Sequence, residues 1–259
     1  MIPNADATAY YRSVLDDKQA RRLLDARPPV ARMAHPTIAE RMMTFSDLRA
    51  MVDRAELGID VVLAAIPALV ADPDPRLGRW ALVAGQLPFS GLDDELYAAS
   101  RAWLVHVLGP KARALGWQRR PHDSDDEHRL RQVVMSIVAR EEPHLRGQAE
   151  KLADRWLVDR TGIADDMVDA VLSAAGRGND PARFDRILAA AKAPRDRTEV
   201  KRLLVALAAF TDPALAKRAL GLTLTTDFDL RESSAIIDRS LVQHETREIA
   251  LAFLEQHID

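Results

Sequence analysis

Cysteine is absent from this chain of 259 residues, and its absence excludes disulfide bonds and thiolate chemistry. Aromatic residues are scarce at 5%, whereas Ala and Leu are abundant. Because strands favour aromatic and β-branched residues, this composition indicates closely packed helices. The net charge of −3 is small, and no basic stripe carries interleaved aromatic residues. We therefore expect no nucleic-acid partner.

Long apolar runs are also missing, since none reaches the ~18 residues that read as a membrane-spanning helix. The first residues lack the basic start and the apolar segment of a secretory signal. These absences predict no membrane partner, and the missing signal favours the cytoplasm.

The short motifs of common catalytic sites do not occur: the chain has no G-x-S-x-G, no P-loop and no G-x-G-x-x-G. The nearest approach to the zinc motif H-E-x-x-H is His244-Glu245-Thr246-Arg247-Glu248, which has Glu where the second His would stand. We interpret Glu245 and Glu248 as favourable charges at the N-terminus of the last helix, where the helix dipole attracts anions.

A second cluster, in which His122 and His128 flank several acidic residues, could in principle hold a cation. Such runs more often form a solvated loop followed by an acidic first helical turn. Ser124 and Glu127 have the spacing of a capping box, so a helix is expected to begin there.

What the chain does contain is a long series of helical segments. In ADPDPRLGRW, GNDPARFDRI and FTDPALAKRA, Asp precedes Pro and an amphipathic stripe. Asp caps free backbone amides and Pro suits the first helical position, which predicts helices that open at Pro75, Pro181 and Pro213. Further helices are expected at residues 16–26, 36–56, 59–71, 93–108, 124–141, 144–160, 163–176, 196–209, 232–243 and 244–258.

A helix pair recurs every ~35–45 residues, which is the range of helical-repeat arrays. The pattern predicts an all-α fold, an irregular α-α superhelix of the HEAT/armadillo-like solenoid type with a short extended N-terminal arm. A compact bundle is the alternative. Residues 16–259 read as one helical-repeat domain, in which the loop at residues 118–126 is the only plausible seam.

The arm NADATAYYR, at residues 4–12, resembles the N-x-x-x-x-G-Y-Y-R segment of the zinc aminopeptidases related to aminopeptidase N and the antigen-trimming endoplasmic-reticulum aminopeptidases. The matching residues are Asn4, Tyr10, Tyr11 and Arg12, while Ala9 replaces the usual Gly. Further stretches are similar to the family in the same order, so the resemblance extends over essentially the whole chain. They are ERMMTFSDLRAMVDRAELG with Arg41 and Asp47, LGPKARALGWQRRPHDSDDEHRLRQVVMSIV, QAEKLADRWLVD and IALAFLEQHID.

The resemblance implies the C-terminal helical domain of such an enzyme. In the family, the tyrosine-bearing segment is the last strand of a β-sandwich, so residues 1–15 would be a residual strand of that preceding domain. The zinc-binding motif and the catalytic residues belong to an upstream domain of the parent enzyme. We therefore expect no cofactor and no catalytic residue in this fragment, which would be inactive alone. Its partners would be the catalytic and β-sandwich domains of the same polypeptide.

The implied function is to enclose a peptide from which the parent enzyme removes N-terminal residues. A free peptide carboxylate suits basic side chains, and Arg129, Arg131, Arg218 and Arg231 are candidates. One alternative is a stand-alone helical-repeat adaptor that binds peptides or proteins; another is a helical enzyme with a site of scattered carboxylates and histidines. Arg outnumbers Lys 30 to 6, which hints at a GC-rich bacterial genome.

Overall fold

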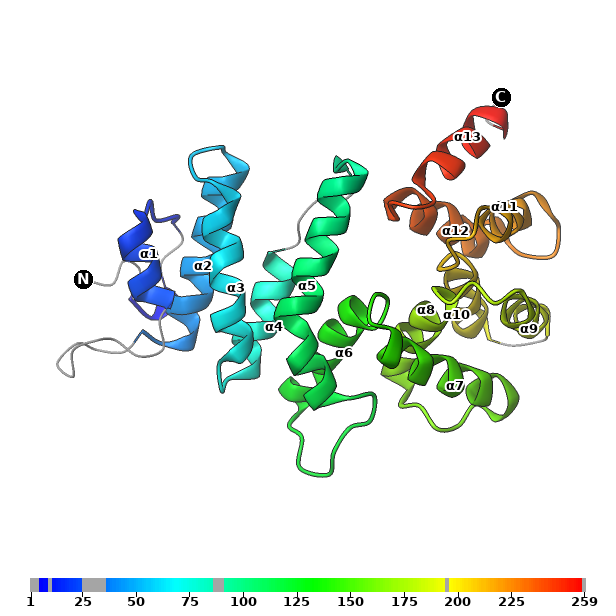
Figure 1. Cartoon of the computed structure of the whole chain (residues 1–259), viewed down its shortest axis with the longest axis horizontal. Coiled ribbons are helices and arrows are strands. Elements are labelled where there is room, and N and C mark those ends of the chain that lie inside the picture. Colours follow the sequence, from blue (N-terminus) through cyan, green and yellow to red (C-terminus); the bar gives the residue numbers. More distant parts are fainter. Residues whose placement is uncertain (1–4, 9–10, 25–35, 86–90, 194–195, 258–259) are drawn as a thin grey trace. The chain divides into compact units, whose positions relative to one another are not determined.

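The computed structural model describes residues 5–8, 11–24, 36–85, 91–193 and 196–257. In these ranges the backbone forms α-helices and short 3-10 turns, without any β-strand (Figure 1). The all-α prediction is thus confirmed. None of the helices in these ranges combines the length and the apolar character needed to cross a bilayer. The chain divides into unit 1, residues 1–87 and 121–133, and unit 2, residues 88–120 and 134–259.

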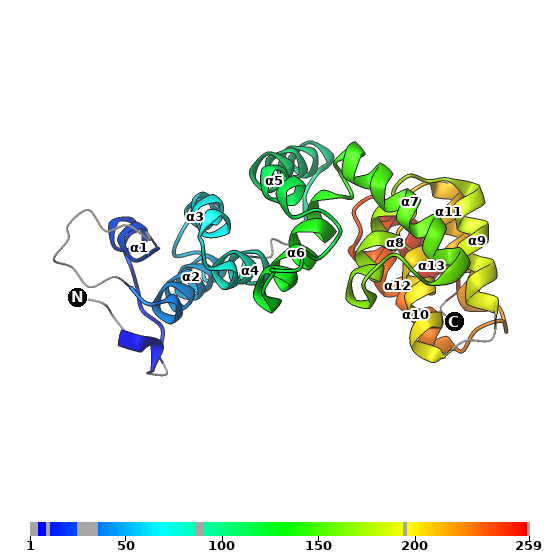
Figure 2. The same cartoon turned by 90° about the horizontal axis from the view of Figure 1, so that it is seen from below.

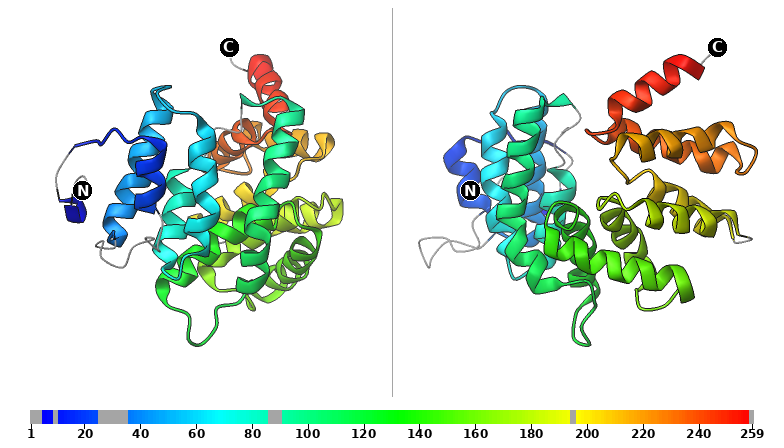
Figure 3. Two further views of the ribbon diagram at one scale, coloured as in Figure 1. Left: turned by 60° about the vertical axis from the view of Figure 1, so that its left-hand side comes forward. Right: turned by 45° about the vertical axis from the view of Figure 1, so that its right-hand side comes forward.

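Unit 1 is built around one central helix, α2, which packs against the other three helices of the N-terminal segment (Figure 3). Phe45 and Leu48 of α2 are fully buried, as the amphipathic stripe predicts. The helices are α1 (Asp17–Leu24), α2 (Ile38–Asp53), α3 (Ile59–Ala71), α4 (Pro75–Ala84) and the first part of α6 (Asp125–Val138).

The N-terminal arm lies on α2 through backbone and side-chain hydrogen bonds. The Asp6 amide donates to Glu40 Oε1 at 2.8 Å, and the Ser13 amide donates to Asp47 Oδ2 at 3.0 Å. Arg12 Nη1 donates to the Ser46 carbonyl at 3.1 Å. The arm therefore satisfies its polar groups on a helix surface.

The secondary structure of the arm differs from a simple extended segment, because Ala5–Ala7 form a 3-10 turn. Residues 11–16 adopt no regular structure, and the Tyr11 side chain is half exposed. Asn4 and Tyr10 lie outside the described residues. That residues 1–15 complete a preceding β-sandwich stays a prediction.

Arg41 joins three parts of unit 1 from a buried position. Its Nη1 lies 2.7 Å from Asp72 Oδ2, and the two side chains are only 5% and 6% exposed. Its Nε and Nη2 donate to the Leu24 carbonyl at 3.2 and 2.9 Å. Since Leu24 ends α1 and Asp72 follows α3, this guanidinium fixes both helices to α2.

Unit 2 is a stack of helices. From α7 onward, each helix packs mainly against helices one or two places along the chain (Figure 2). Neighbour-only packing is typical of helical-repeat arrays, which confirms the predicted solenoid-like fold. The helices are α5 (Asp94–Leu115), the second part of α6, α7 (Pro143–Asp159), α8 (Val168–Gly176), α9 (Pro181–Lys192), α10 (Arg197–Leu207), α11 (Pro213–Gly221), α12 (Leu230–Val242) and α13 (Arg247–His257).

Small residues let the helices of unit 2 approach closely. A Cβ at Gly176 would lie 3.1 Å from the Cβ of Ala209, so α8 runs against the end of α10 with no room for a side chain. Nearby, the rings of Phe184 and Phe210 meet edge to face at 5.2 Å, an arrangement that aromatic pairs favour. Small residues such as Ala and Gly thus allow close packing in the core.

Helix starts follow the predicted Asp-Pro rule. Asp74, Asp180 and Asp212 each accept a hydrogen bond from the amide two residues ahead, and α4, α9 and α11 open on the Pro that follows. The capping box before α6 is confirmed as well. The Glu127 amide donates to Ser124 Oγ at 3.2 Å, and the Ser124 amide donates to Glu127 Oε2 at 2.8 Å.

Other helix bounds differ from the prediction. Helix α5 continues through Pro110 to Leu115, seven residues beyond the expected end at Leu108. The buried Gly109 and Ala112 place this extra length in the core, and that packing offsets the one backbone hydrogen bond that Pro removes. Helix α13 begins at Arg247, later than the expected His244, because residues 244–246 form a turn with tertiary contacts.

Candidate functional site

The four arginines proposed from the sequence have different surroundings. Arg129 is exposed and lies 3.9 Å from Asp126, and Arg131 is fully buried, where it binds Asp123 and contacts His128 Nδ1 at 3.3 Å. Arg218 donates to Asp185 at 2.8 Å, and Arg231 is exposed at the start of α12.

A fully buried guanidinium offers a peptide no accessible donor, so the contacts of Arg131 are structural. For Arg129, Arg218 and Arg231 a substrate role stays a prediction. His128 lies inside α6, as the expected helix start at Ser124 implies, and it is 6% exposed.

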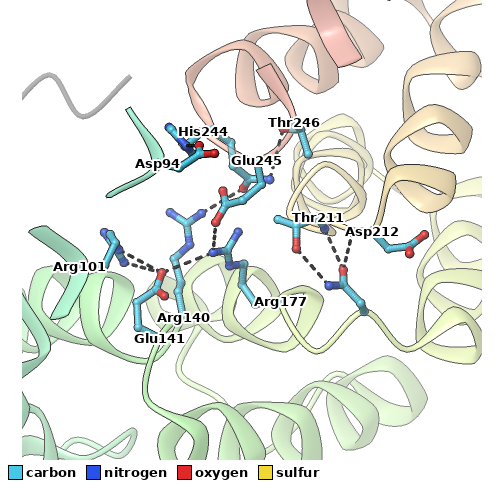
Figure 4. Close-up of polar contacts among 12 residues, drawn as sticks. Asp94, Arg101, Arg140, Glu141, Arg177, Thr211, Asp212, His244, Glu245 and Thr246 are labelled. Carbon is cyan, nitrogen blue, oxygen red and sulfur yellow. Dashed lines mark hydrogen bonds and ion pairs between the residues drawn. The ribbon is translucent and has the colours of Figure 1, made fainter. Parts of the chain in front are cut away.

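A different group of arginines gathers within unit 2, around the start of α13 (Figure 4). Arg101 of α5 donates to Glu141 Oε1 from Nη2 at 2.8 Å and from Nε at 3.1 Å. Arg177, which follows α8, lies 3.4 Å from the same Glu141 oxygen and also binds Glu245 in the turn between α12 and α13. We call Arg101, Glu141, Arg177 and Glu245 the arginine network.

Electrostatics in the arginine network favour the charged forms of its central pair. The Arg177 side chain is 8% exposed, and this burial alone would lower its pKa. Hydrogen bonding and attraction from Glu245, with attraction from Glu141, outweigh burial and raise the pKa of Arg177. Burial likewise acts to raise the pKa of Glu245, but Arg177 outweighs it and the pKa is lowered.

The lowered pKa of Glu245 gives the free energy of unfolding of unit 2 a dependence on acid pH. A carboxyl whose folded-state pKa is depressed contributes its full stabilisation above its unfolded value of 4.5, and that contribution is lost as the pH falls through the folded value. Below pH 4.5, the wild-type protein is therefore expected to lose more stability than Glu245→Gln loses over the same range. Urea unfolding at a series of pH values measures this difference, and parallel pH profiles would contradict it.

Beside the arginine network lies a pocket of about 100 Å³, which we call the cationic pocket. Arg140 enters it with Nη2 donating to Gln243 Oε1 at 3.0 Å. Among the described residues, neither Arg140 nor Arg239 has an ion-pair partner, and the buried Nε of each lacks a hydrogen-bond acceptor. The lining residues are Tyr97, Arg101, Arg140, Arg239, Val242, Gln243 and His244.

The cationic pocket concentrates positive charge. Burial, followed by repulsion from Arg239, Arg177 and Arg101, lowers the pKa of Arg140 to about 9. Burial and the charge of Arg177 also lower the pKa of Arg239. Since a pKa of about 9 still leaves a guanidinium charged at pH 7, the pocket holds uncompensated cations at neutral pH, and an anion would relieve their repulsion.

His244 also lines the cationic pocket. Its Nε2 lies 2.8 Å from Asp94 Oδ1, and its ring stacks on Tyr97 with centroids 4.0 Å apart. The interpretation of Glu245 as a charge on the last helix is wrong, because this residue precedes α13 and binds Arg177, while Glu248 does lie in the first turn. In the described ranges, no three His, Asp or Glu side chains gather as a metal site requires.

A second pocket in unit 2, of about 280 Å³, is larger but differs in charge. Its lining includes Arg160 and Arg202, and each faces a carboxylate: Arg160 lies 2.7 Å from Glu199, and Arg202 lies 2.8 Å from Asp165. Because these cations are already compensated, the smaller cationic pocket is the better candidate site for an anionic ligand.

Comparison with known proteins agrees with the fold. The family model described as the ERAP1-like C-terminal domain matches residues 1–259. A search of curated proteins found no match. The chain therefore belongs to the ERAP1-like C-terminal domains, a family of C-terminal domains of M1 aminopeptidases.

Proposed function

We propose that this domain encloses a peptide substrate of a zinc aminopeptidase and that the cationic pocket receives the carboxylate at the peptide's C-terminal end. The uncompensated charge of Arg140 carries the proposal. A peptide being shortened from its N-terminus keeps one anionic group at the far end, and Arg guanidinium is the side chain best suited to bind a carboxylate. The domain thereby positions the substrate without taking part in bond chemistry.

Two further observations support a binding role at this position. Gln243 is buried and orients Arg140 through the 3.0 Å hydrogen bond, so the donor is held before any ligand arrives. Glu141 and Glu245 compensate Arg101 and Arg177, which leaves Arg140 and Arg239 available to a ligand. Such preorganised, unpaired donors are what an anion site requires.

The chain's own residues do not fit a catalytic zinc site. It lacks H-E-x-x-H, and in the part of the chain that the structure describes no three His, Asp or Glu side chains gather as a metal site requires. We therefore place zinc chemistry and the removal of N-terminal residues in another domain of the parent polypeptide, with this domain as its substrate-holding and regulatory part.

The test compares two N-acetylated peptides that are identical except for a free carboxylate or an amide at the C-terminal end. Loss of a charged hydrogen-bond acceptor costs about 1.5 kcal/mol, so the amide is expected to bind about tenfold more weakly in calorimetry. Arg140→Gln should lower the affinity for the acid by a similar factor and leave the affinity for the amide nearly unchanged.

Arg155→Gln is the matched control, because Arg155 is exposed and lies in the same unit, and because its replacement removes the same charge. It should leave both affinities unchanged. Equal binding of acid and amide to the wild-type domain would contradict the proposal and favour a stand-alone adaptor, which would grip internal peptide segments without regard to the end group.

A further inference from the structure

A single ligand carboxylate would not neutralise the positive charge around the cationic pocket. The arginine network and the pocket together hold four guanidiniums, Arg101, Arg140, Arg177 and Arg239, against the carboxylates of Glu141 and Glu245. This leaves a surplus of two positive charges. Asp94 does not cancel it, because that carboxylate is fully exposed to solvent and pairs with His244.

The two surplus charges can be assigned to particular side chains. Arg101 and Arg177 are paired with carboxylates, whereas the one described side-chain partner of Arg140 is the neutral amide of Gln243. Arg239 has no hydrogen-bond or ion-pair partner among the residues that the structure describes. One ligand carboxylate would compensate one of these two guanidiniums and leave the other unpaired in a partly buried place.

We propose that the cationic pocket selects peptides whose last residue is acidic, with Arg140 binding the terminal carboxylate and Arg239 binding the side-chain carboxylate. The inference rests on the proposed function and specifies its substrate class. The assignment follows from how each donor is held. Gln243 fixes Arg140, which suits the invariant terminal group. Arg239, which has no bound partner in the described ranges, can follow a side chain of variable length.

The lining of the pocket argues against a large apolar last residue. Among the described lining residues, only Val242 and Tyr97 have largely apolar side chains, and Val242 is 65% exposed. A long aliphatic side chain would bury little area there and would desolvate the guanidiniums without compensating them. An acidic last residue brings two carboxylates, one for each of the guanidiniums of Arg140 and Arg239.

The experiment uses four N-acetylated peptides that differ only at the last residue: Glu or Gln, each with a free carboxylate or an amide. Glu and Gln have nearly the same shape, so the difference in affinity between their peptides reports the effect of the side-chain charge. The Glu acid is expected to bind the wild-type domain roughly tenfold more tightly than the Gln acid. The Gln acid should in turn bind more tightly than the Gln amide.

The outcomes separate the two proposals. If the Gln acid and the Gln amide bind equally, or if no peptide binds, the proposed function fails and this inference fails with it. If the Gln acid binds better than its amide but the Glu acid gains nothing over the Gln acid, only the acidic selectivity is overturned.

A variant tests the assignment to Arg239. Arg239→Gln should abolish the preference for Glu over Gln and keep the preference for acid over amide. Because burial and repulsion from Arg177 outweigh the attraction of Glu245 for the Arg239 charge, its removal should not lower the thermal midpoint, and a folded variant is expected. Arg155→Gln should preserve both preferences. Retention of the Glu preference in Arg239→Gln would overturn the assignment.

Discussion

Replacement of Arg41 by Met is expected to destabilise unit 1 by about 4 kcal/mol, because it leaves the Asp72 carboxylate charged and buried without its partner. The Leu24 carbonyl loses two donors at the same time, so the end of α1 loses its attachment to α2. Urea unfolding measures the loss, and hydrogen exchange read segment by segment should place it in α1, α2 and the turn before α4.

The matched control for Arg41 is Arg54→Gln, which breaks an ion pair with Glu56 whose side chains are 43% and 46% exposed. Exposed pairs contribute little, so a change below about 1 kcal/mol is expected. If Arg41→Met lowered the free energy of unfolding no more than this control, the ion pair of Arg41 and Asp72 would not hold α1 in place. The two side chains would then be more exposed to solvent than the structure has them.

Replacement of Arg177 by Met should cost unit 2 about 3 kcal/mol, since it leaves two partly buried carboxylates, Glu141 and Glu245, with less positive charge to compensate them. Glu141 keeps Arg101, and Glu245 loses its direct partner. Adding Glu245→Gln to the Arg177→Met variant should therefore recover part of the stability. Urea unfolding of the two single variants and the double variant gives the coupling free energy.

Arg186→Gln serves as the control in unit 2, because the Arg186 side chain is 48% exposed and its partner Asp154 keeps Arg183. A loss below about 1 kcal/mol is expected there. Strict additivity of Arg177→Met and Glu245→Gln would show that the two side chains do not stabilise one another, contrary to the contacts of the arginine network.

The helices were predictable because their signals are local. Asp74 and Pro75 are adjacent, and Ser124 and Glu127 are three residues apart, so short windows of sequence contain the whole cap. The end of α5 was missed for a related reason. Pro110 is a local stop signal, and the burial of Gly109 and Ala112, which a local pattern does not reveal, explains why the helix continues.

The candidate site was not predictable in the same way. Its contacts join residues 40, 68 and 150 positions apart, namely Arg101 to Glu141, Arg177 to Glu245 and His244 to Asp94. Charge alone did not single out these residues, because the chain has 36 Lys and Arg in all. The one local signal is the His244-Glu245 pair, which lacks the second His of a zinc motif.

The packing of unit 2 determines how cooperatively that unit unfolds. Helices held only by near neighbours along the chain can fray from either end in small steps, each at little cost. The contacts from Arg177 to Glu245 and from His244 to Asp94 join the turn before α13 to α8 and α5, far back along the chain. Because they join distant parts of the chain, we expect these contacts, chiefly the buried one of Arg177, to make the openings more cooperative. An anion bound beside them would then slow the opening of helices that it does not contact.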